Sequence, residues 1–245
     1  MQRNKNPLRG QETKVHQQIK KLYLDSVIQG EQEVITEIDN RKFRIDVFDK
    51  LEKKAYEIQR HNFGKGFYDK IELLTRKMRV IIVHPIVIKQ KITRMKNGNI
   101  IGTSYINKTK KADFYSLFEK LVSFRTSFIP GKLGFDVLLI REHVKKEFIG
   151  RWKKSNRPRY KMIQRELINI ENSINIRKKA DLLTFLPENL PKVFTNRNIS
   201  DQLEIQGNER RKSRIAGWMT YSLCNLGLLS QVGKKGRAHL FKIPK

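Results

Sequence analysis

Residues 33–59 constrain the fold more than any other stretch, because apolar and polar residues alternate along them. Alternation with a period of two is the pattern of a β-strand whose two faces lie in different surroundings. We predict three consecutive strands, Glu33–Ile38, Phe43–Phe48 and Lys54–Gln59. The first connection begins at Asp39-Asn40, whose side chains hydrogen-bond their own backbone and tolerate tight bends. The stretch therefore predicts neighbouring strands joined by short turns.

Two carboxylates interrupt the apolar pattern on neighbouring strands, Asp46 on the second and Glu57 on the third. Alternation directs Ile45 and Val47 to one face of the second strand and Asp46 to the other. Such a carboxylate is costly to desolvate unless it is paired, and two together repel each other unless a cation lies between them. Hard oxygen ligands suit Mg²⁺, so we expect Asp46 and Glu57 to bind Mg²⁺ or Mn²⁺. The alternative is a pair of strand-surface charges neutralised by Arg44 or Lys54.

The spacing of these residues resembles the metal-binding core of the PD-(D/E)XK nuclease superfamily, which has an Asp on one strand and (D/E)-x-K on the next. Here Ile-Asp-Val at 45–47 is followed by Tyr-Glu-Ile-Gln at 56–59. Gln59 replaces the lysine, which resembles the E-x-Q variants of some restriction enzymes and competence-associated nucleases. The resemblance implies that Asp46 and Glu57 hold a metal ion that assists hydrolysis of DNA phosphodiester bonds. Gln59 would orient a water molecule or a phosphate, but it can neither supply a charge nor act as a base.

The segment before the strands predicts a helix over residues 11–29. Four polar residues share one face of this helix at spacings of four and three, namely Glu12, His16, Lys20 and Tyr23. In the superfamily that the chain resembles, a helix before the first strand often contributes a further glutamate. We therefore expect Glu12 of this helix, or Glu37 of the first strand, to complete the metal shell.

The predicted element order continues with a helix at 65–78 and an apolar strand at Arg79–Ile86, which gives α-β-β-β-α-β. A strand reached through a helix normally returns parallel to its neighbour by a right-handed crossover. We expect Pro85 to end the regular pairing of that strand. The predicted fold class is α/β (α+β), with a restriction-endonuclease-like core at residues 11–106 after a basic arm at 1–10.

The following residues, 107–179, predict an extension of this core. Asn97-Gly98 at the end of the core is a strong signal for a two-residue hairpin turn. A short amphipathic helix at Ala112–Ser123 and a strand at Phe135–Val144 follow. Apolar residues at helical spacing predict a linking helix over residues 161–176, namely Ile163, Leu167, Ile170 and Ile174.

Residues 180–245 predict a winged-helix domain of three helices and a β-hairpin. Thr195 is a good N-cap for the second helix, and Glu209–Leu226 is the third, with Gly227 ending it. A tight turn at 233–236 would form the wing. Over most of its length the chain also resembles an uncharacterised prokaryotic family that joins a nuclease-like domain to a winged helix.

Charge indicates the partner. The chain has 52 Lys and Arg against 24 Asp and Glu, a net charge of +28, and such a surplus attracts polyanions. We expect contacts to double-stranded or branched DNA from the first helix, from the loop after the third strand, from the basic loop 150–161, from the start of the third C-terminal helix and from the wing. The residues are Lys20, His61, Asn62, Lys65, Arg151, Lys153, Lys154, Arg157, Arg159, Arg210, Arg211, Lys212, Arg214, Lys234, Lys235 and Arg237.

The sequence also narrows the setting in which the protein works. A single cysteine, Cys224, excludes an intramolecular disulfide, and the basic N-terminus lacks the apolar stretch of a signal peptide. The best apolar run, Val80–Ile88, is too short to span a bilayer. We expect a cytoplasmic, nucleoid-associated protein without membrane contact, and a homodimer is compatible with cutting a duplex.

The function predicted from the sequence is therefore a metal-dependent DNA endonuclease. The alternatives are a catalytically inactive DNA-binding protein that keeps the nuclease fold as a scaffold, and a structure-specific or RNA-directed nuclease. A ribosome-associated or membrane-surface protein accounts for the basic charge less fully, because the predicted domains favour nucleic acid.

Overall fold

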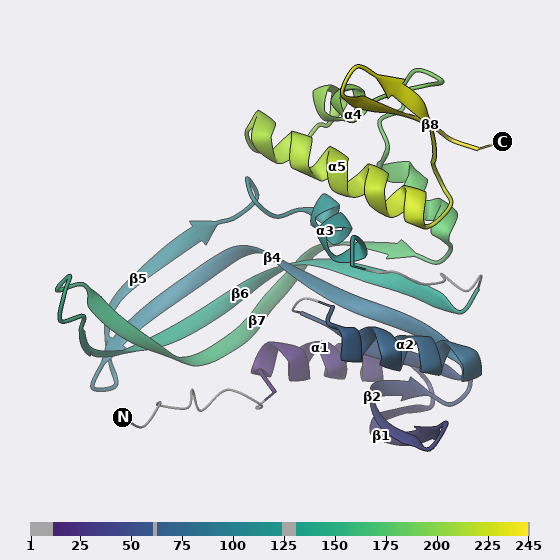
Figure 1. Ribbon diagram of the computed structural model, residues 1–245. Helices are drawn as coiled ribbons and strands as arrows, with labels where there is room; N and C mark the ends of the chain where they lie inside the picture. Colours follow the sequence, from purple (N-terminus) through teal and green to yellow (C-terminus); the bar gives the residue numbers. More distant parts are fainter. Residues whose placement is uncertain (1–11, 61–62, 124–130, 245) are drawn as a thin grey trace.

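The structure is a computed structural model that describes residues 12–60, 63–123 and 131–244 (Figure 1). It is a mixed α/β fold built on a seven-stranded sheet with the order β1-β2-β3-β4-β6-β7, in which β5 pairs with the far half of β4. The strands are β1 (Gly30–Ile38), β2 (Arg41–Asp49), β3 (Lys54–Ile58), β4 (Arg79–Lys96), β5 (Asn99–Asn107), β6 (Leu133–Arg151) and β7 (Pro158–Ile176). The principal helices around it are α1 (Lys14–Asp25), α2 (Lys65–Lys77) and α3 (Leu117–Leu121).

The first six elements occur in the predicted order, α1-β1-β2-β3-α2-β4. β1, β2 and β3 pair antiparallel, and β3 pairs parallel with β4, as expected for a strand reached through a helix. The turn between β1 and β2 has positive φ at Asp39 (50°) and Asn40 (59°), a conformation that Asx residues tolerate. The turn before β5 has the same character at Asn97 and Gly98, which confirms the predicted hairpin.

β4 continues through Pro85 to Lys96, so the prediction that Pro85 ends the strand is wrong. The last pair between β3 and β4 is Ile58 with Val83, and Val83 accepts a hydrogen bond from the Gln59 N–H on that side. Alternate residues of a strand face the same neighbour, so position 85 faces the side on which β3 has already ended. The missing N–H of proline therefore removes no ladder hydrogen bond.

The predicted linking helix over residues 161–176 is also wrong, because this segment belongs to β7, which pairs antiparallel with β6. The register passes over Ile163, Ile168 and Glu171, and each is an extra residue of a β-bulge. Every bulge shifts the alternation of inward-facing and outward-facing side chains by one residue. Apolar side chains of β7 therefore follow one another at spacings of three and four, as in a helix. The predicted helix at 112–123 is shorter than expected, with a 3₁₀ turn at Phe114–Ser116 followed by α3.

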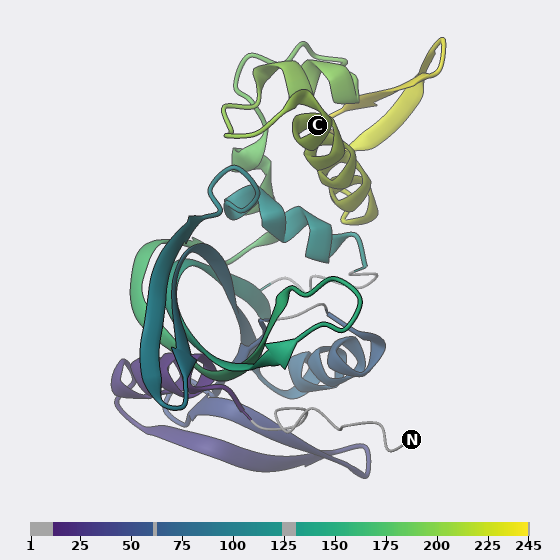
Figure 2. The same cartoon turned by 90° about the vertical axis from the view of Figure 1, so that its left-hand side faces the viewer.

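Two hydrophobic cores cover the two faces of the sheet. The smaller lies under α1 and contains Val15 and Ile19 together with Val47 of β2. The larger lies on the other face and joins α2, α3 and the C-terminal helices, with Phe118 at 0% exposure. Figure 1 shows α3 between the sheet and α5, and Figure 2 shows the far halves of β4 to β7 curving around a common axis. The C-terminal region is therefore packed on the sheet.

The C-terminal region contains, in order, a 3₁₀ segment at Lys179–Phe185, α4 (Asn196–Gln202), α5 (Glu209–Asn225) and the hairpin of β8 (Ser230–Lys235) and β9 (Ala238–Lys242). Thr195 caps α4, and Gly227 follows α5 with φ 69°, as predicted. The hairpin turn is at Gly236-Arg237, because β8 extends through the residues that were expected to form the turn. No helix in the described part of the chain is long and apolar enough to cross a membrane.

Candidate functional site

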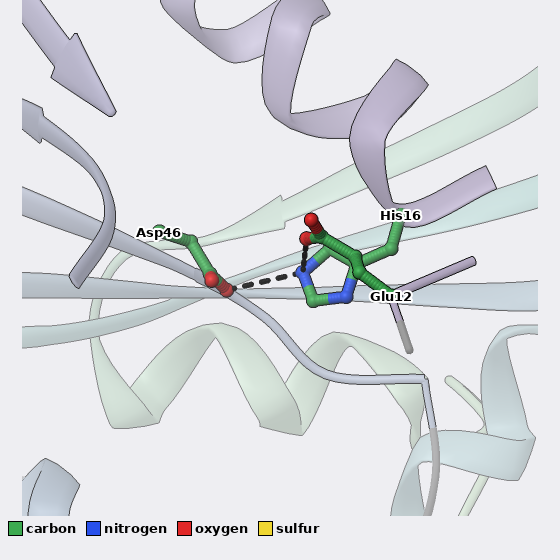
Figure 3. Close-up of side chains that lie close together, drawn as sticks. All are labelled: Glu12, His16 and Asp46. Atoms are coloured by element: carbon green, nitrogen blue, oxygen red, sulfur yellow. Dashed lines mark hydrogen bonds and ion pairs between the residues drawn. The ribbon is translucent and has the colours of Figure 1, made fainter. Parts of the chain in front are cut away.

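Three side chains of metal-ligand type converge where α1 approaches β2. Figure 3 shows Glu12, His16 and Asp46 pointing toward one another. The His16 Nε2 atom lies 3.2 Å from Asp46 Oδ2 and 3.6 Å from Glu12 Oε1. One ligand atom from each residue lies within 4.8 Å of the other two. The set has two carboxylates, which are ligands of Mg²⁺ and Mn²⁺, and one imidazole, which is a ligand of divalent transition metals.

The helix places two of these side chains. Thr13 is the N-cap of α1 and accepts a hydrogen bond from the His16 backbone N–H at 3.4 Å, which fixes where the helix begins. From there a spacing of four directs Glu12, His16 and Lys20 to the same side. The predicted shared face of this segment is therefore confirmed.

The strand that pairs with the one carrying Asp46 is locally irregular. The register pairs Gln32 with Val47 and Val34 with Ile45, so Glu33 lies opposite Asp46, and Glu33 has a positive φ of 56°. Ile45 belongs to the larger core and Val47 to the smaller one. The prediction that Ile45 and Val47 share a face is wrong, because the β1–β2 ladder is distorted at this level.

Lys20 lies at the centre of the cluster and is only 3% exposed. Its Nζ atom is 2.6 Å from Glu12 Oε1 and 3.2 Å from Asp46 Oδ1, and it also contacts the Glu33 carboxylate. We predicted that Lys20 contacts nucleic acid, but this position leaves it no open path to an external phosphate. Its ammonium instead draws three carboxylates together, since each would otherwise repel the others.

Asp46 is held in its ionised form. Burial alone would raise its pKa, but the hydrogen bond and charge of His16, the Ile58 N–H and the charge of Lys20 together lower the pKa of Asp46 to about 2. The Ile58 N–H donates to Asp46 Oδ2 at 2.8 Å, at the point where β3 ends. Asp46 is therefore an anion over the whole physiological pH range.

Glu57 is close to this cluster but has its own partner. It is 3% exposed, and its Oε2 atom accepts a hydrogen bond of 2.6 Å from Lys70 of α2. Its Oε1 atom is buried and has no hydrogen-bond partner among the described residues. Burial, opposed by Lys70 and reinforced by the charge of Asp46, raises the pKa of Glu57 to about 7. The structure thus groups Asp46 with Glu12 and His16 more closely than with Glu57.

The other predicted residues are not among the three ligands of the cluster. Gln59 follows β3, and its carbonyl oxygen lies 2.6 Å from Nδ1 of the buried His84. Glu37 is an exposed residue of β1 opposite Lys42, outside the cluster. Lys65 is exposed at the start of α2. His61 and Asn62 lie outside the described residues.

The predicted basic loop is the tip of the β6–β7 hairpin, where Arg151, Lys153, Lys154 and Arg157 are exposed. Trp152 is 56% exposed, and the Arg159 guanidinium lies 4.5 Å from its ring centroid. Lys234, Lys235 and Arg237 are exposed at the tip of the C-terminal hairpin. Both tips present basic side chains to solvent.

Arg211 differs from the other predicted basic residues of α5, because it is buried, with 6% exposure. Its guanidinium donates to Asp113 at 2.8 Å and to the Gln206 carbonyl at 2.7 Å. The expectation that Arg211 is exposed at the helix start is therefore wrong. The spacing in the sequence indicates the burial of Arg211, since it lies four residues before Ile215 on the buried face of the helix.

The remaining residues of that helix start are accessible. Arg210 and Arg214 line a cavity of about 750 Å³ together with Lys110 and Lys111 of the loop after β5. Lys212 lines a different cavity and lies 3.6 Å from Glu209.

Three residues of the site were not predicted from the sequence to act there. His16 was placed on the correct face, but it was not proposed as a ligand, although its spacing of four from Glu12 was the available signal. Glu33 had no signal, since its role depends on a local distortion of β1. Lys70 reaches Glu57 only because α2 packs beside β3, which no local pattern reveals.

Residues 13–177 match the model of a protein family described as a domain of unknown function (DUF8091). The matched segment runs from the N-cap of α1 to the end of β7 and includes His16, Asp46 and Glu57. No curated protein and no solved structure matches the chain.

Proposed function

The chain belongs to the DUF8091 family, and we propose that it is a metal-dependent endonuclease that hydrolyses DNA phosphodiester bonds. The observation that carries this proposal is the convergence of Glu12, His16 and Asp46 within 4.8 Å in a chain of net charge +28. Clustered acidic ligands are unfavourable for a protein that binds polyanions unless they serve a cation. A bound metal ion would remove the repulsion between this acidic cluster and the DNA phosphates.

The residues of the cluster fit a divalent cation by the type and the closeness of their ligand atoms. Glu12, Glu33 and Asp46 carry three negative charges, and Lys20 is the cation in contact with all three. Arg44 also pairs with Glu33 at 2.8 Å, so one negative charge is left among the three carboxylates. Glu12, His16 and Asp46 would hold Mg²⁺ or Mn²⁺, which would polarise the scissile phosphate and lower the pKa of a bound water molecule.

The chain's own residues have separate tasks in this proposal. Lys20 keeps Glu12 and Asp46 close together when the ion is absent. Glu57, whose pKa is raised to about 7 by burial, can accept or release a proton at its unpartnered Oε1 atom near neutral pH. Gln59, which begins the segment after β3, would orient the attacking water molecule or the phosphate.

The fold supports the proposal. The order α1-β1-β2-β3-α2-β4, with β3 parallel to β4, agrees with a restriction-endonuclease-like core of the PD-(D/E)XK type. The order of α4, α5 and the β8–β9 hairpin agrees with a winged helix over residues 180–245. The exposed basic side chains on both hairpin tips would contact the DNA backbone.

A second candidate is a DNA-binding protein without catalysis. The position of Lys20 favours it, because an ammonium in contact with all three carboxylates neutralises part of the charge that would attract a metal ion. In that case the cluster is an internal ion-pair network that stabilises the contact between α1 and the sheet.

Cleavage of supercoiled plasmid and of a branched DNA panel, with Mg²⁺, Mn²⁺ or EDTA, separates the two candidates. We expect metal-dependent cleavage by the wild type and loss of it in Asp46→Asn and His16→Ala. Glu37→Gln is the matched control, because it removes an exposed carboxylate outside the cluster and should leave cleavage unchanged. Salt-sensitive binding without cleavage of any substrate would replace the nuclease by the second candidate.

A further inference from the structure

A second charged group lies next to the candidate site, where β3 ends. Glu142 of β6 is fully buried and accepts hydrogen bonds from Gln90 and from Arg60, the latter at 2.9 Å. Arg165 of β7 lies 3.3 Å from the same carboxylate. Two guanidinium groups therefore share one buried anion, which leaves an uncompensated positive charge inside the protein.

These two arginines line a cavity of about 300 Å³. Its other charged residues are Lys111, Lys120 and Glu119. Counting Glu142 behind the wall, four cationic side chains face two carboxylates, a surplus of two positive charges. The Nε atom of Arg165 is also buried without a hydrogen-bond partner in the described part of the chain. A buried donor of this kind is costly unless a ligand accepts its hydrogen bond.

This cavity adjoins the acidic cluster. Arg60 follows Gln59 at the end of β3, and its Nη1 atom donates to Thr13 Oγ1 at 3.0 Å. Thr13 is the N-cap of α1 and lies directly after Glu12. Arg60, in the wall of the cavity, is thus connected by a hydrogen bond to the residue that follows the first candidate metal ligand.

The same cavity is a neighbour of the cavity at α5, because the two share a lining residue. Lys111 lines both the 300 Å³ cavity and the 750 Å³ cavity that contains Lys110, Arg210 and Arg214. Within the described residues, Lys110, Lys111 and Arg210 have no ion-pair partner. Among the residues that the structure describes, no carboxylate lines the larger cavity, so its wall between the loop after β5 and the start of α5 is strongly positive.

We propose that these two cavities form one phosphodiester track, defined by Arg60, Arg165, Lys111, Lys110, Arg210 and Arg214, along which a nucleic-acid strand runs from the start of α5 to the acidic cluster. The chemistry is that of repeated singly charged phosphates, since the cationic groups are distributed along a path instead of converging on one point. The direction of the path toward the cluster rests on the proposed nuclease function. The binding itself does not.

The main test is a Lys110→Gln/Lys111→Gln double variant, because both side chains are exposed and their removal leaves the fold intact. Binding of a labelled 20-base-pair duplex and of the corresponding single strand is measured by fluorescence anisotropy in EDTA, over a salt series. Each lost phosphate contact lowers the slope of log Kd against log salt by about 0.9 for duplex and about 0.7 for single-stranded DNA. We expect decreases of about 1.8 and about 1.4.

The matched control is Lys21→Gln/Lys77→Gln, which removes two exposed helical lysines on α1 and α2, away from both cavities. It should leave the slope unchanged. An equal decrease in this control would show that only net charge matters and would overturn the track, as would an unchanged slope in the Lys110/Lys111 variant.

Adding Arg165→Gln tests whether the two cavities act together. The slope for duplex DNA should fall further, to a total decrease of about 2.7, whereas no further decrease would restrict the site to the α5 groove and refute one track. The measurements are repeated in an Asp46→Asn background. Binding there is independent of cleavage, so failure of the nuclease proposal and failure of the track are distinguishable.

Discussion

Replacement of Glu57 by glutamine gives a quantitative test of the site. Burial raises the pKa of this carboxyl from 4.5 to about 7, so the folded protein binds its proton more tightly than the unfolded chain does. Between these two values the folded state holds more protons, and stability must fall as the pH rises. This contribution is fully present below about pH 4.5 and is lost as the pH passes through about 7.

The size of the effect follows from the two pKa values. Integration from pH 5 to pH 8 gives a loss of about 2.5 kcal/mol in the free energy of unfolding of the wild type relative to Glu57→Gln. The glutamine has no proton to exchange in this range, and its amide oxygen can still accept the hydrogen bond of Lys70. Any constant offset from the changed contact is the same at every pH and does not enter the difference.

The assay is urea unfolding followed by circular dichroism at pH 5, 6, 7 and 8 in EDTA, for the wild type and the variant. Glu72→Gln on α2 is the control, because its side chain is 42% exposed, and its curve should run parallel to that of the wild type. A wild-type minus Glu57→Gln difference that stays constant with pH would refute the inference that Glu57 holds its proton near neutrality.

Three further predictions concern other parts of the chain. Asp113→Asn leaves the buried guanidinium of Arg211 without its ion-pair partner and should lower the free energy of unfolding, measured in urea, by about 3 kcal/mol. Glu209→Gln removes the 79% exposed partner of Lys212 and should lower it by less than about 0.5 kcal/mol. Equal effects would contradict the structural role of Arg211. Trp152→Ala should weaken anisotropy-measured binding of single-stranded DNA by about 1 to 3 kcal/mol without changing the salt slope, and a changed slope would argue against base stacking. Mn²⁺ at one hundred times its Kd should raise the free energy of unfolding, measured in urea, by about 2.7 kcal/mol. The same increase in Asp46→Asn would place the ion elsewhere.

Local patterns were enough to predict the elements that build the site. The spacing of Glu12, His16 and Lys20 identified one helix face, and the structure brings that face to Asp46. The Asp-Asn pair at 39–40 and the Asn-Gly pair at 97–98 located two turns correctly, because few residue types tolerate a positive φ. These signals depend on neighbours within four residues, which is the range over which one sequence is informative.

Failures occurred where tertiary packing decides the outcome. The pairing of Glu57 with Lys70 depends on how α2 lies on the sheet, and the burial of Arg211 depends on a loop almost one hundred residues earlier. β7 was predicted as a helix because its bulges at Ile163 and Ile168 shift the alternation, and a bulge is visible only against the partner strand. The place of Glu33 in the cluster was not predicted for a similar reason, since no local sequence pattern indicates the distortion of β1 at that residue.

The length of β4 has a mechanical consequence. One strand of 18 residues, about 60 Å long, pairs with β3 near the acidic cluster and with β5 near the far hairpin, and β6 follows it for most of that distance. The register with β6 passes over Ile88, between these two halves, and such a bulge is a point at which the strand can bend. The distance between the two ends of β4 changes when β4 and its partner strands lengthen or shorten together. Steps of two residues keep every side chain on its original face of the sheet. A change of that kind would alter the far end of the sheet and leave the acidic cluster beside β3 unchanged.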